Sequence, residues 1–153
     1  MGGLKMEMPA NFTYIPGVRA CISRIAFNFG FDDRESYQIE TIVDEICNNA
    51  IEHGSKKKDT KIRLECKFEQ DQMELVVTDT GNRKFNVEQV FMHNIKRLQE
   101  EISKGLADSP HRGRGLIIVQ KLVDKLDIKT TRNGTTVKIL KRRHSDAPLA
   151  ASS

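Results

Sequence analysis

The segment that decides the fold is IVDEICNNAIEHGS, which runs from Ile42 to Ser55. Its apolar residues return every three or four positions, so it predicts an amphipathic helix with one buried face. Glu45, Asn49 and His53 recur every fourth residue along the border of that face. Asn is a poor helix former in a helix interior. The pattern therefore indicates that these polar residues are kept for a chemical role rather than for the stability of the helix.

Three polar groups on one border of a helix offer a definite chemistry. A carboxylate, an amide oxygen and an imidazole can serve as a base, a metal ligand and a phosphate contact. Two other interpretations remain open from the residues alone. Glu45 and Asn49 are compatible with a solvent-facing pair, and His53 with a residue favoured by the dipole at a helix C-terminus.

Length and composition indicate one globular domain. The chain has 153 residues, of which 38% are hydrophobic and 30% charged, and this suits one domain with a substantial core. It has no run of ~18 apolar residues that would span a membrane, and its start lacks the apolar core of a secretory signal. Three cysteines without a CxxC pair argue against a disulfide framework or a zinc site, so we expect them to fill the core. We therefore expect a cytoplasmic protein without a membrane partner.

Positive charge is gathered in three short runs, although the net charge is only +4. The runs lie at residues 56–58, 111–114 and 141–144. No aromatic residues interleave with them, which argues against direct binding of nucleic acid. We interpret the runs as a solvated loop, a phosphate-facing loop and a polar tail.

Hydrophobic periodicity places the other elements of the fold. Their order predicts an α/β two-layer sandwich, with a mixed, mostly antiparallel sheet and helices on one face. The expected elements are an edge strand at 5–9, a helix at 16–29, a helix that begins after Asp32 or Asp33 and ends at Gly54, strands at 62–68 and 73–77, a helix at 86–104, a helix from 116 to 126, and strands at 128–131 and 136–140 joined by an Asn133-Gly134 turn.

Asp79 follows the second of these strands in phase with its apolar residues. Met73, Leu75 and Val77 alternate with polar residues, so Asp79 is expected on the same inward side of the sheet. An inward carboxylate at a strand end needs a partner or a ligand. The other interpretation is an Asp that starts a turn before Gly81.

The stretch Arg112-Gly113-Arg114-Gly115 precedes an apolar helix and is suited to binding an anion. Glycine lets backbone N–H groups approach a phosphate, and the N-terminus of the following helix adds a favourable dipole. Taken alone this signal is weak, because glycine before a helix is common.

Taken together and in order, these stretches resemble one family. DEICNNAIEHGS, VVTDTG and HRGRGLIIVQKLVDKL, closing with NGTTVKIL, are similar to the N, G1 and G2 boxes of the GHKL ATPase superfamily, which includes gyrase, MutL and the histidine kinases. The compact length and the start MEMPANFTYIPGVRACISRIA most resemble the bacterial anti-sigma factor serine/threonine kinases of the RsbW and SpoIIAB type. The resemblance implies a Bergerat-type ATP-binding fold, with a single kinase domain at residues 1–144 and a disordered tail at 145–153.

The resemblance also implies roles for the residues of the first box. Glu45 would be the general base that accepts the proton of a serine hydroxyl. Asn49 would complete the shell of Mg²⁺ together with the phosphate oxygens of ATP, and His53 would lie near the phosphates.

The other boxes would hold the remainder of the nucleotide. Asp79 would accept a hydrogen bond from the adenine amino group, and Gly81 would let the adenine approach closely. The residues implied for the phosphates and for support of the adenine base are His111, Arg112, Gly113, Arg114, Gly115 and Thr135. Either His111 or Arg112 could contact the γ-phosphate or the substrate, and the G1 box departs from the family pattern because Asn82-Arg83-Lys84 replaces its second glycine.

Two functions of different classes follow from the resemblance. The first is an enzyme that phosphorylates a serine of a STAS-domain anti-anti-sigma protein and sequesters a sigma factor as a homodimer. The second is a nucleotide-dependent anti-sigma binding module with little kinase activity. Glu45 favours the enzyme, because a binding module has no need of a base. The catalytic domain of a histidine kinase is less favoured, because we expect no room in this chain for phosphoacceptor helices.

Overall fold

The computed structural model of the chain describes residues 3–53, 60–79, 92–93, 95–96, 100, 115–131 and 134–144. The elements in chain order are β1 (Leu4–Pro9), a short 3₁₀ helix η1 (Phe12–Tyr14), α1 (Ile15–Asn28), α2 (Asp33–His53), β2 (Lys61–Phe68), β3 (Gln72–Asp79), α4 (Gly115–Leu122), β4 (Lys125–Thr131) and β5 (Gly134–Arg142).

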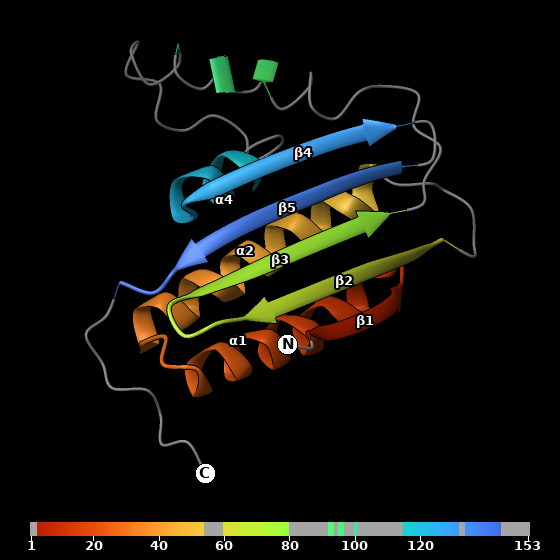
Figure 1. The fold of residues 1–153 in the computed structure, drawn as a ribbon. Coiled ribbons are helices and arrows are strands. Elements are labelled where there is room, and N and C mark those ends of the chain that lie inside the picture. The colour runs from red at the N-terminus through yellow and green to blue at the C-terminus, as the bar shows by residue number, and fades with distance from the viewer. Residues whose placement is uncertain are drawn as a thin grey trace.

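The strands form one sheet in the order β1-β2-β3-β5-β4. Every pairing among these described strands is antiparallel. The helices α1, α2 and α4 cover one face and leave the other open (Figure 1). The predicted fold class, an α/β sandwich with helices on one face of a mostly antiparallel sheet, is confirmed.

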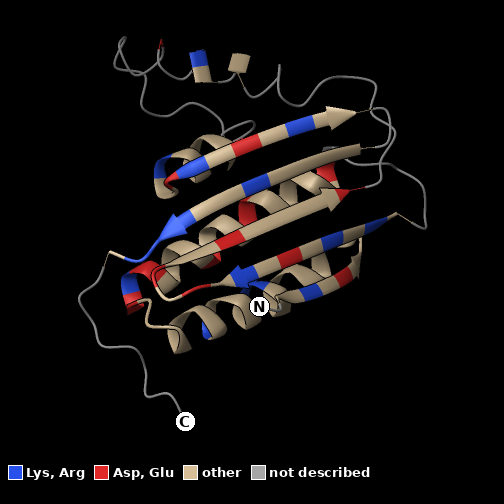
Figure 2. Ribbon diagram, viewed as in Figure 1, with Lys and Arg blue, Asp and Glu red and all other residues tan. Residues whose placement is uncertain are grey.

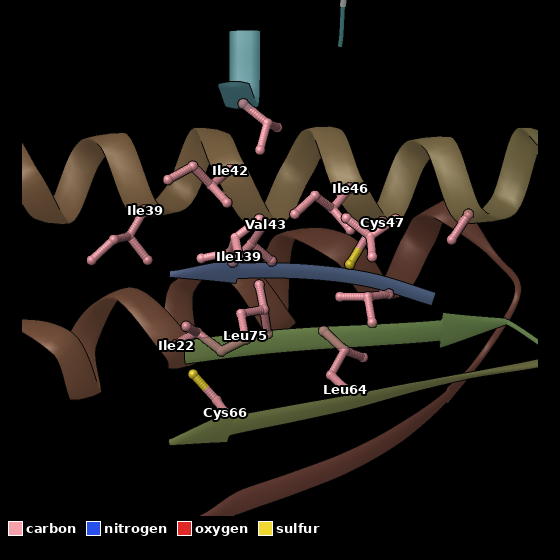
Figure 3. Packing of buried hydrophobic residues seen from close by; sticks show 14 of the residues in the cluster. Ile22, Ile39, Ile42, Val43, Ile46, Cys47, Leu64, Cys66, Leu75 and Ile139 are labelled. Atoms are coloured by element: carbon pink, nitrogen blue, oxygen red, sulfur yellow. The ribbon is translucent and has the colours of Figure 1, made fainter. Parts of the chain in front are cut away.

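The core lies between α2 and the sheet. Figure 3 shows Ile39 and Cys47 of α2 pointing towards Ile139 and Leu75 of the strands. Each such side chain contributes about 1.5–3 kcal/mol when it is fully buried. The fully buried apolar residues include Ile22, Phe31, Ile39, Ile42, Val43, Ile46, Ile62, Met73, Leu75, Val77, Val119 and Ile139. The stripe that periodicity assigned to α2 is thus its buried face.

Local signals set the start of α2 as the sequence predicts. Gly30 adopts a φ of 100°, which ends α1. The Asp32 carboxylate accepts a hydrogen bond from the N–H of Glu35 at 2.7 Å, and the Glu35 carboxylate accepts one from the N–H of Asp32 at 3.2 Å. This reciprocal capping box satisfies two N–H groups at the helix start.

Three expectations about the elements are wrong. The last helix ends at Leu122 rather than at Leu126, and β4 begins at Lys125. Residues 125–131 alternate in burial and pair with β5 along their whole length, and this pairing outweighs the helical spacing of Leu126. Cys21 is exposed, so it does not fill the core as Cys47 and Cys66 do. Lys141 lies within β5 and is buried, so it does not belong to a polar tail.

Charged side chains occupy the open face of the sheet. Figure 2 shows Lys and Arg close to Asp and Glu on neighbouring strands. The Lys61 Nζ atom lies 3.4 Å from Oε1 of Glu7, and the Lys138 Nζ atom lies 3.6 Å from Oε1 of Glu74. Exposed pairs of this kind contribute about 0–1 kcal/mol each, so they solubilise the face more than they stabilise it.

Several expectations concern residues outside the described part of the chain. They are the tail at 145–153 and most of the helix at 86–104. Ile95, which is described, packs against the core. Within the described ranges, no helix is both long and apolar enough to cross a membrane.

We predict that the three thiols differ sharply in reactivity. Burial, aided by the charge of Asp44, raises the pKa of Cys47 to about 12, and burial also raises the pKa of Cys66 to about 12. At pH 8 iodoacetamide should therefore alkylate only the exposed Cys21 in the folded protein, because the thiolate is the reactive form. Peptide mapping by mass spectrometry measures the label, and labelling in urea should reach all three thiols.

The same pKa shifts predict that the protein becomes less stable as the pH rises above about 9. Thiols of the unfolded chain ionise near 9.0, whereas the buried thiols stay protonated up to about 12. The stabilisation they give is complete below pH 9 and falls as the pH rises through that interval. Rapid native alkylation of Cys47 or Cys66 would contradict this account of the core.

Candidate functional site

The end of β3 carries a buried carboxylate. Asp79 is only 2% exposed, and it faces the helix-covered side of the sheet, as its phase with Val77 predicts. Its Oδ1 accepts a hydrogen bond from the N–H of Thr135 on β5 at 3.4 Å. Asp79 therefore sits where β3 and β5 meet, with its carboxylate fixed by the neighbouring strand.

Gly134 makes this arrangement possible. Its φ is 134°, a conformation that favours glycine. A Cβ at this position would overlap the carbonyl oxygen of Asp79 and lie 3.2 Å from Oδ1. The turn glycine predicted from Asn133-Gly134 thus also allows the backbone of β5 to lie directly against Asp79.

Threonine hydroxyls lie on the strands next to Asp79. The hydroxyls of Thr135 and Thr130 lie 3.2 Å apart, and Thr135 is 1% exposed. Thr78 and Thr136 alternate with Asp79 and Thr135 along their strands, so their hydroxyls, 3.4 Å apart, lie on the open face of the sheet instead. On the helix-covered side, the strand ends at this corner therefore offer the Asp79 carboxylate and the hydroxyls of Thr130 and Thr135 for hydrogen bonding.

The polar border of α2 lies on the same, helix-covered side of the sheet. Glu45 and Asn49 are both half-buried, which agrees with a position between the apolar face and solvent. A Cβ at Gly115, the first residue of α4, would lie 2.5 Å from Oε2 of Glu45. The glycine therefore leaves room for the Glu45 carboxylate at the N-terminus of α4, where the helix dipole favours negative charge.

Asp44, the residue before Glu45, forms an ion pair that the sequence does not predict. The Asp44 carboxylate accepts a hydrogen bond from the guanidinium of Arg19 on α1 at 2.9 Å. Both side chains are about a third exposed, at 40% and 33%, so the pair contributes modestly to stability. Arg19 and Asp44 are 25 residues apart, and no local spacing signals their contact.

The structure therefore brings some of the expected site residues together. Glu45 meets Gly115, and Asp79 meets Thr135. The backbone of His53 ends α2, but its side chain lies outside the described residues. Within the described ranges, no three His, Cys, Asp or Glu side chains group as a metal site would require. The expected residues that lie outside the described part of the chain are Gly81, His111, Arg112, Gly113 and Arg114.

The described part of the site consists of the buried Asp79 carboxylate beside Gly134 and the half-buried Glu45 carboxylate beside Gly115. Residues 8–141 match the model of the family described as "Histidine kinase-like ATPase domain". The chain belongs to this family of ATPases. The resemblance to the GHKL superfamily is thereby confirmed over nearly all of the chain.

Two relatives that carry the name serine-protein kinase RsbW are similar to this chain along most of their length. The serine-protein kinase RsbW of Bacillus pumilus is 25% identical, over 90% of this chain and 84% of the relative. RsbW of Halalkalibacterium halodurans is 29% identical, over 82% of this chain and 75% of the relative. These similarities support the expected likeness to RsbW-type kinases within the family.

A solved structure shares the fold. It is the histidine kinase domain of the blue-light activated histidine kinase EL346 of Erythrobacter litoralis, with a TM-score of 0.52 and 19% sequence identity. The match covers 89% of this chain, which spans 62% of that solved chain. At this identity the likeness concerns the arrangement of helices and strands alone.

We predict that Gly134→Ala destabilises the protein. The new Cβ would meet the Asp79 backbone, and alanine would have to adopt a positive φ. Backbone strain and overpacking each cost about 1–3 kcal/mol, so the free energy of unfolding should fall by about 2–6 kcal/mol in urea titrations.

Gly17→Ala is the matched control for this substitution. Gly17 lies in α1, and a Cβ there would meet nothing within 4 Å. Alanine is the better helix former by about 0.8–1.0 kcal/mol, so this variant should be at least as stable as the native protein. If Gly134→Ala has native stability, the close approach of Gly134 to Asp79 is wrong.

Proposed function

We propose that this chain is an ATP-dependent protein serine kinase that phosphorylates a STAS-domain anti-anti-sigma protein and holds a sigma factor. The proposal assigns both activities to one domain at residues 1–144. The observation that carries it is the Glu45 carboxylate lying against Gly115 at the start of α4, in a chain of an ATPase family. The relatives designated serine-protein kinases support serine as the acceptor.

The corner around Asp79 fits the adenine end of ATP. A buried carboxylate is a strong acceptor for an exocyclic amino group, since hydrogen bonds to charged groups contribute about 1.5–3 kcal/mol. Asp79 is held by Thr135, and Gly134 keeps the adjacent backbone free of a side chain. In this assignment Asp79 binds the adenine, while Thr135 supports the base and fixes the carboxylate.

Glu45 is the group suited to move a proton. ATP supplies the γ-phosphoryl group when it is bound. A serine hydroxyl is a weak nucleophile at neutral pH, so a carboxylate must accept its proton as the new O–P bond forms and the bond to the ADP leaving group breaks. Gly115 leaves space for that carboxylate, which is half-buried and therefore less hydrated than a surface group.

Asn49 lies one helical turn after Glu45 on the same half-buried border of α2. Its amide oxygen is a ligand type that Mg²⁺ accepts alongside phosphate oxygens and water. We assign Asn49 to the Mg²⁺ that accompanies ATP, which adds charge neutralisation to the positioning that phosphoryl transfer requires.

The partner surface is assigned to the N-terminal region, from Asn11 to Arg24. Phe12 and Tyr14 are each 49% exposed beside the first helix. Exposed aromatic side chains are typical of protein interfaces. We propose that this region of a cytoplasmic homodimer contacts the sigma factor and the STAS-domain substrate.

We predict that Asp79→Asn weakens the binding of MgATP by roughly 10- to 100-fold, because the amide replaces a charged acceptor. Isothermal titration calorimetry measures the affinity, with thermal melting as a check that the variant is folded. Asp127→Asn makes the same change at an exposed position of β4 and should bind as the native protein does. Equal affinity in both variants would contradict the adenine assignment.

We predict that Glu45→Ala lowers phosphoryl transfer by the roughly 10²–10⁴-fold typical of a lost general base. Its affinity for MgATP should stay near the native value, because the carboxylate acts on the serine rather than on the nucleotide. The assay uses labelled ATP and the STAS-domain protein encoded nearest to this gene. Glu40→Ala, on the same helix but away from Gly115, is the matched control and should transfer at the native rate.

The outcomes of this assay separate the candidate functions. Asn49→Ala should lose Mg²⁺-dependent nucleotide binding as well as transfer, unlike Glu45→Ala. Label on a serine of the partner supports the kinase. Absence of transfer with tight, nucleotide-dependent binding of a sigma factor favours the binding module, and label on a histidine favours a histidine kinase.

A further inference from the structure

A buried lysine connects three elements at the end of the molecule away from Asp79. Lys141 is 4% exposed near the end of β5. Its ammonium donates hydrogen bonds to Oε1 of Gln38 on α2 at 2.9 Å and to the carbonyl oxygen of Leu122, the last residue of α4, at 2.7 Å. One side chain of the sheet thus ties together the two helices that carry Glu45 and Gly115.

The surroundings compensate for burying this charge. Burial lowers the pKa of Lys141, while the nearby carboxylates of Glu35, Asp124 and Asp32 oppose the shift. The carbonyl of Leu122 belongs to the free end of a helix, where a cation is favoured by the helix dipole. A buried charge is costly unless hydrogen bonds and opposite charges compensate for it, and Lys141 has two hydrogen-bond acceptors with three carboxylates nearby.

Main-chain contacts fix the elements on either side of Lys141. The N–H of Arg142 donates to the Asp124 carboxylate at 2.7 Å, and the N–H of Asp124 donates to the carbonyl of Leu140 at 2.9 Å. The N–H of His144 donates to the Glu35 carboxylate at 2.8 Å. The ammonium therefore acts from a fixed point rather than from a loose chain end.

The spacing of the contacts on the two helices matches. Gln38 and Glu45 are seven residues apart on α2, and Gly115 and Leu122 are seven residues apart on α4. Seven residues make nearly two turns and rise about 10.5 Å, so each pair lies on one face of its helix. α2 and α4 pack against each other, with Gly115 at Glu45 and Leu122 tied to Gln38 through Lys141. The helices are therefore antiparallel, with one contact point at each end of α4.

We propose that Lys141 fixes the position of α4 along α2 and thereby holds Gly115 against Glu45. α4 has only eight residues, and a helix this short is marginal on its own and depends on tertiary anchors. α4 is held against the core by Leu116, Ile117 and Val119. Without the ammonium, however, its C-terminal end loses its link to Gln38, and its position along α2 is set less firmly. Lys141 is then a positioning residue for the proposed kinase reaction, and this inference rests on that proposed function.

The test compares Lys141→Met with Lys138→Met. Both changes remove an ammonium from β5, but Lys138 is exposed on the open face. Displacement of catalytic groups by about 1 Å can cost 10²-fold in rate, so kcat for transfer should fall by roughly 10- to 100-fold in Lys141→Met. The KM for ATP should change much less than kcat, because Thr135 lies at the opposite end of β5 and Asp79 lies beside it on β3. Lys141→Arg, which keeps a charged donor, should recover part of kcat, and Lys138→Met should match the native protein.

A second measurement does not depend on kinase activity. Hydrogen exchange at the amides of α4 should be roughly tenfold or more faster in Lys141→Met than in the native protein, with α1 unchanged as a reference. This arm tests the anchoring even if the native protein transfers no phosphate, an outcome that would instead overturn the proposed function. If Lys141→Met does not fold, Gln38→Ala removes one acceptor while the Leu122 carbonyl still pairs the ammonium, and a smaller loss of kcat is expected.

Native kcat in a folded Lys141→Met variant would overturn the inference. A parallel fall of kcat, ATP affinity and stability would also overturn it, since it would show a general structural role. Unchanged exchange in α4 would contradict the anchoring itself.

Discussion

The structure depends on α2 serving two purposes along one helix. Ile42, Val43 and Ile46 are fully buried against the sheet, while Glu45 and Asn49 lie half-buried on the adjoining border. Close-packed interiors tolerate little movement. The packing of the apolar face therefore also fixes the positions of Glu45 and Asn49 on the same helix. Glu45 and Asn49 need no separate scaffold, because the core already fixes the helix that carries them.

The sequence predicted those features that depend on local period. The inward orientation of Asp79 followed from its phase with Val77, and the turn at Gly134 followed from the Asn-Gly pair. The helical spacing of Leu126 predicts a longer α4 than the structure has, because the pairing of residues 125–131 with β5 is not visible in any local pattern. Hydrophobic periodicity therefore predicts an element correctly where helical and strand spacing do not overlap in the same residues.

Contacts between residues far apart in the chain leave no signal in the local sequence. Arg19 and Asp44 are 25 residues apart, and the ammonium of Lys141 meets a carbonyl 19 residues away. Three further basic residues follow Lys141, and this run of charge predicts a polar tail. The phase of Lys141 with Val137 and Ile139 was the available signal, since alternate residues of a strand share one face. The charge of a residue is thus a weaker guide to burial than its place in the strand.

The central position of β5 in the sheet affects how the fold can vary. β5 lies between β3 and β4, and Thr78 of β3 faces Thr136 at a separation of 58 residues in the chain. Pairing these strands closes a long loop, an entropic cost that slows folding relative to the local β2–β3 hairpin. That cost rises only by about 0.6 kcal/mol for each doubling of the loop. Insertions between β3 and α4 therefore cost little stability, and evolution can lengthen or replace this connection while the order and pairing of the strands stay the same.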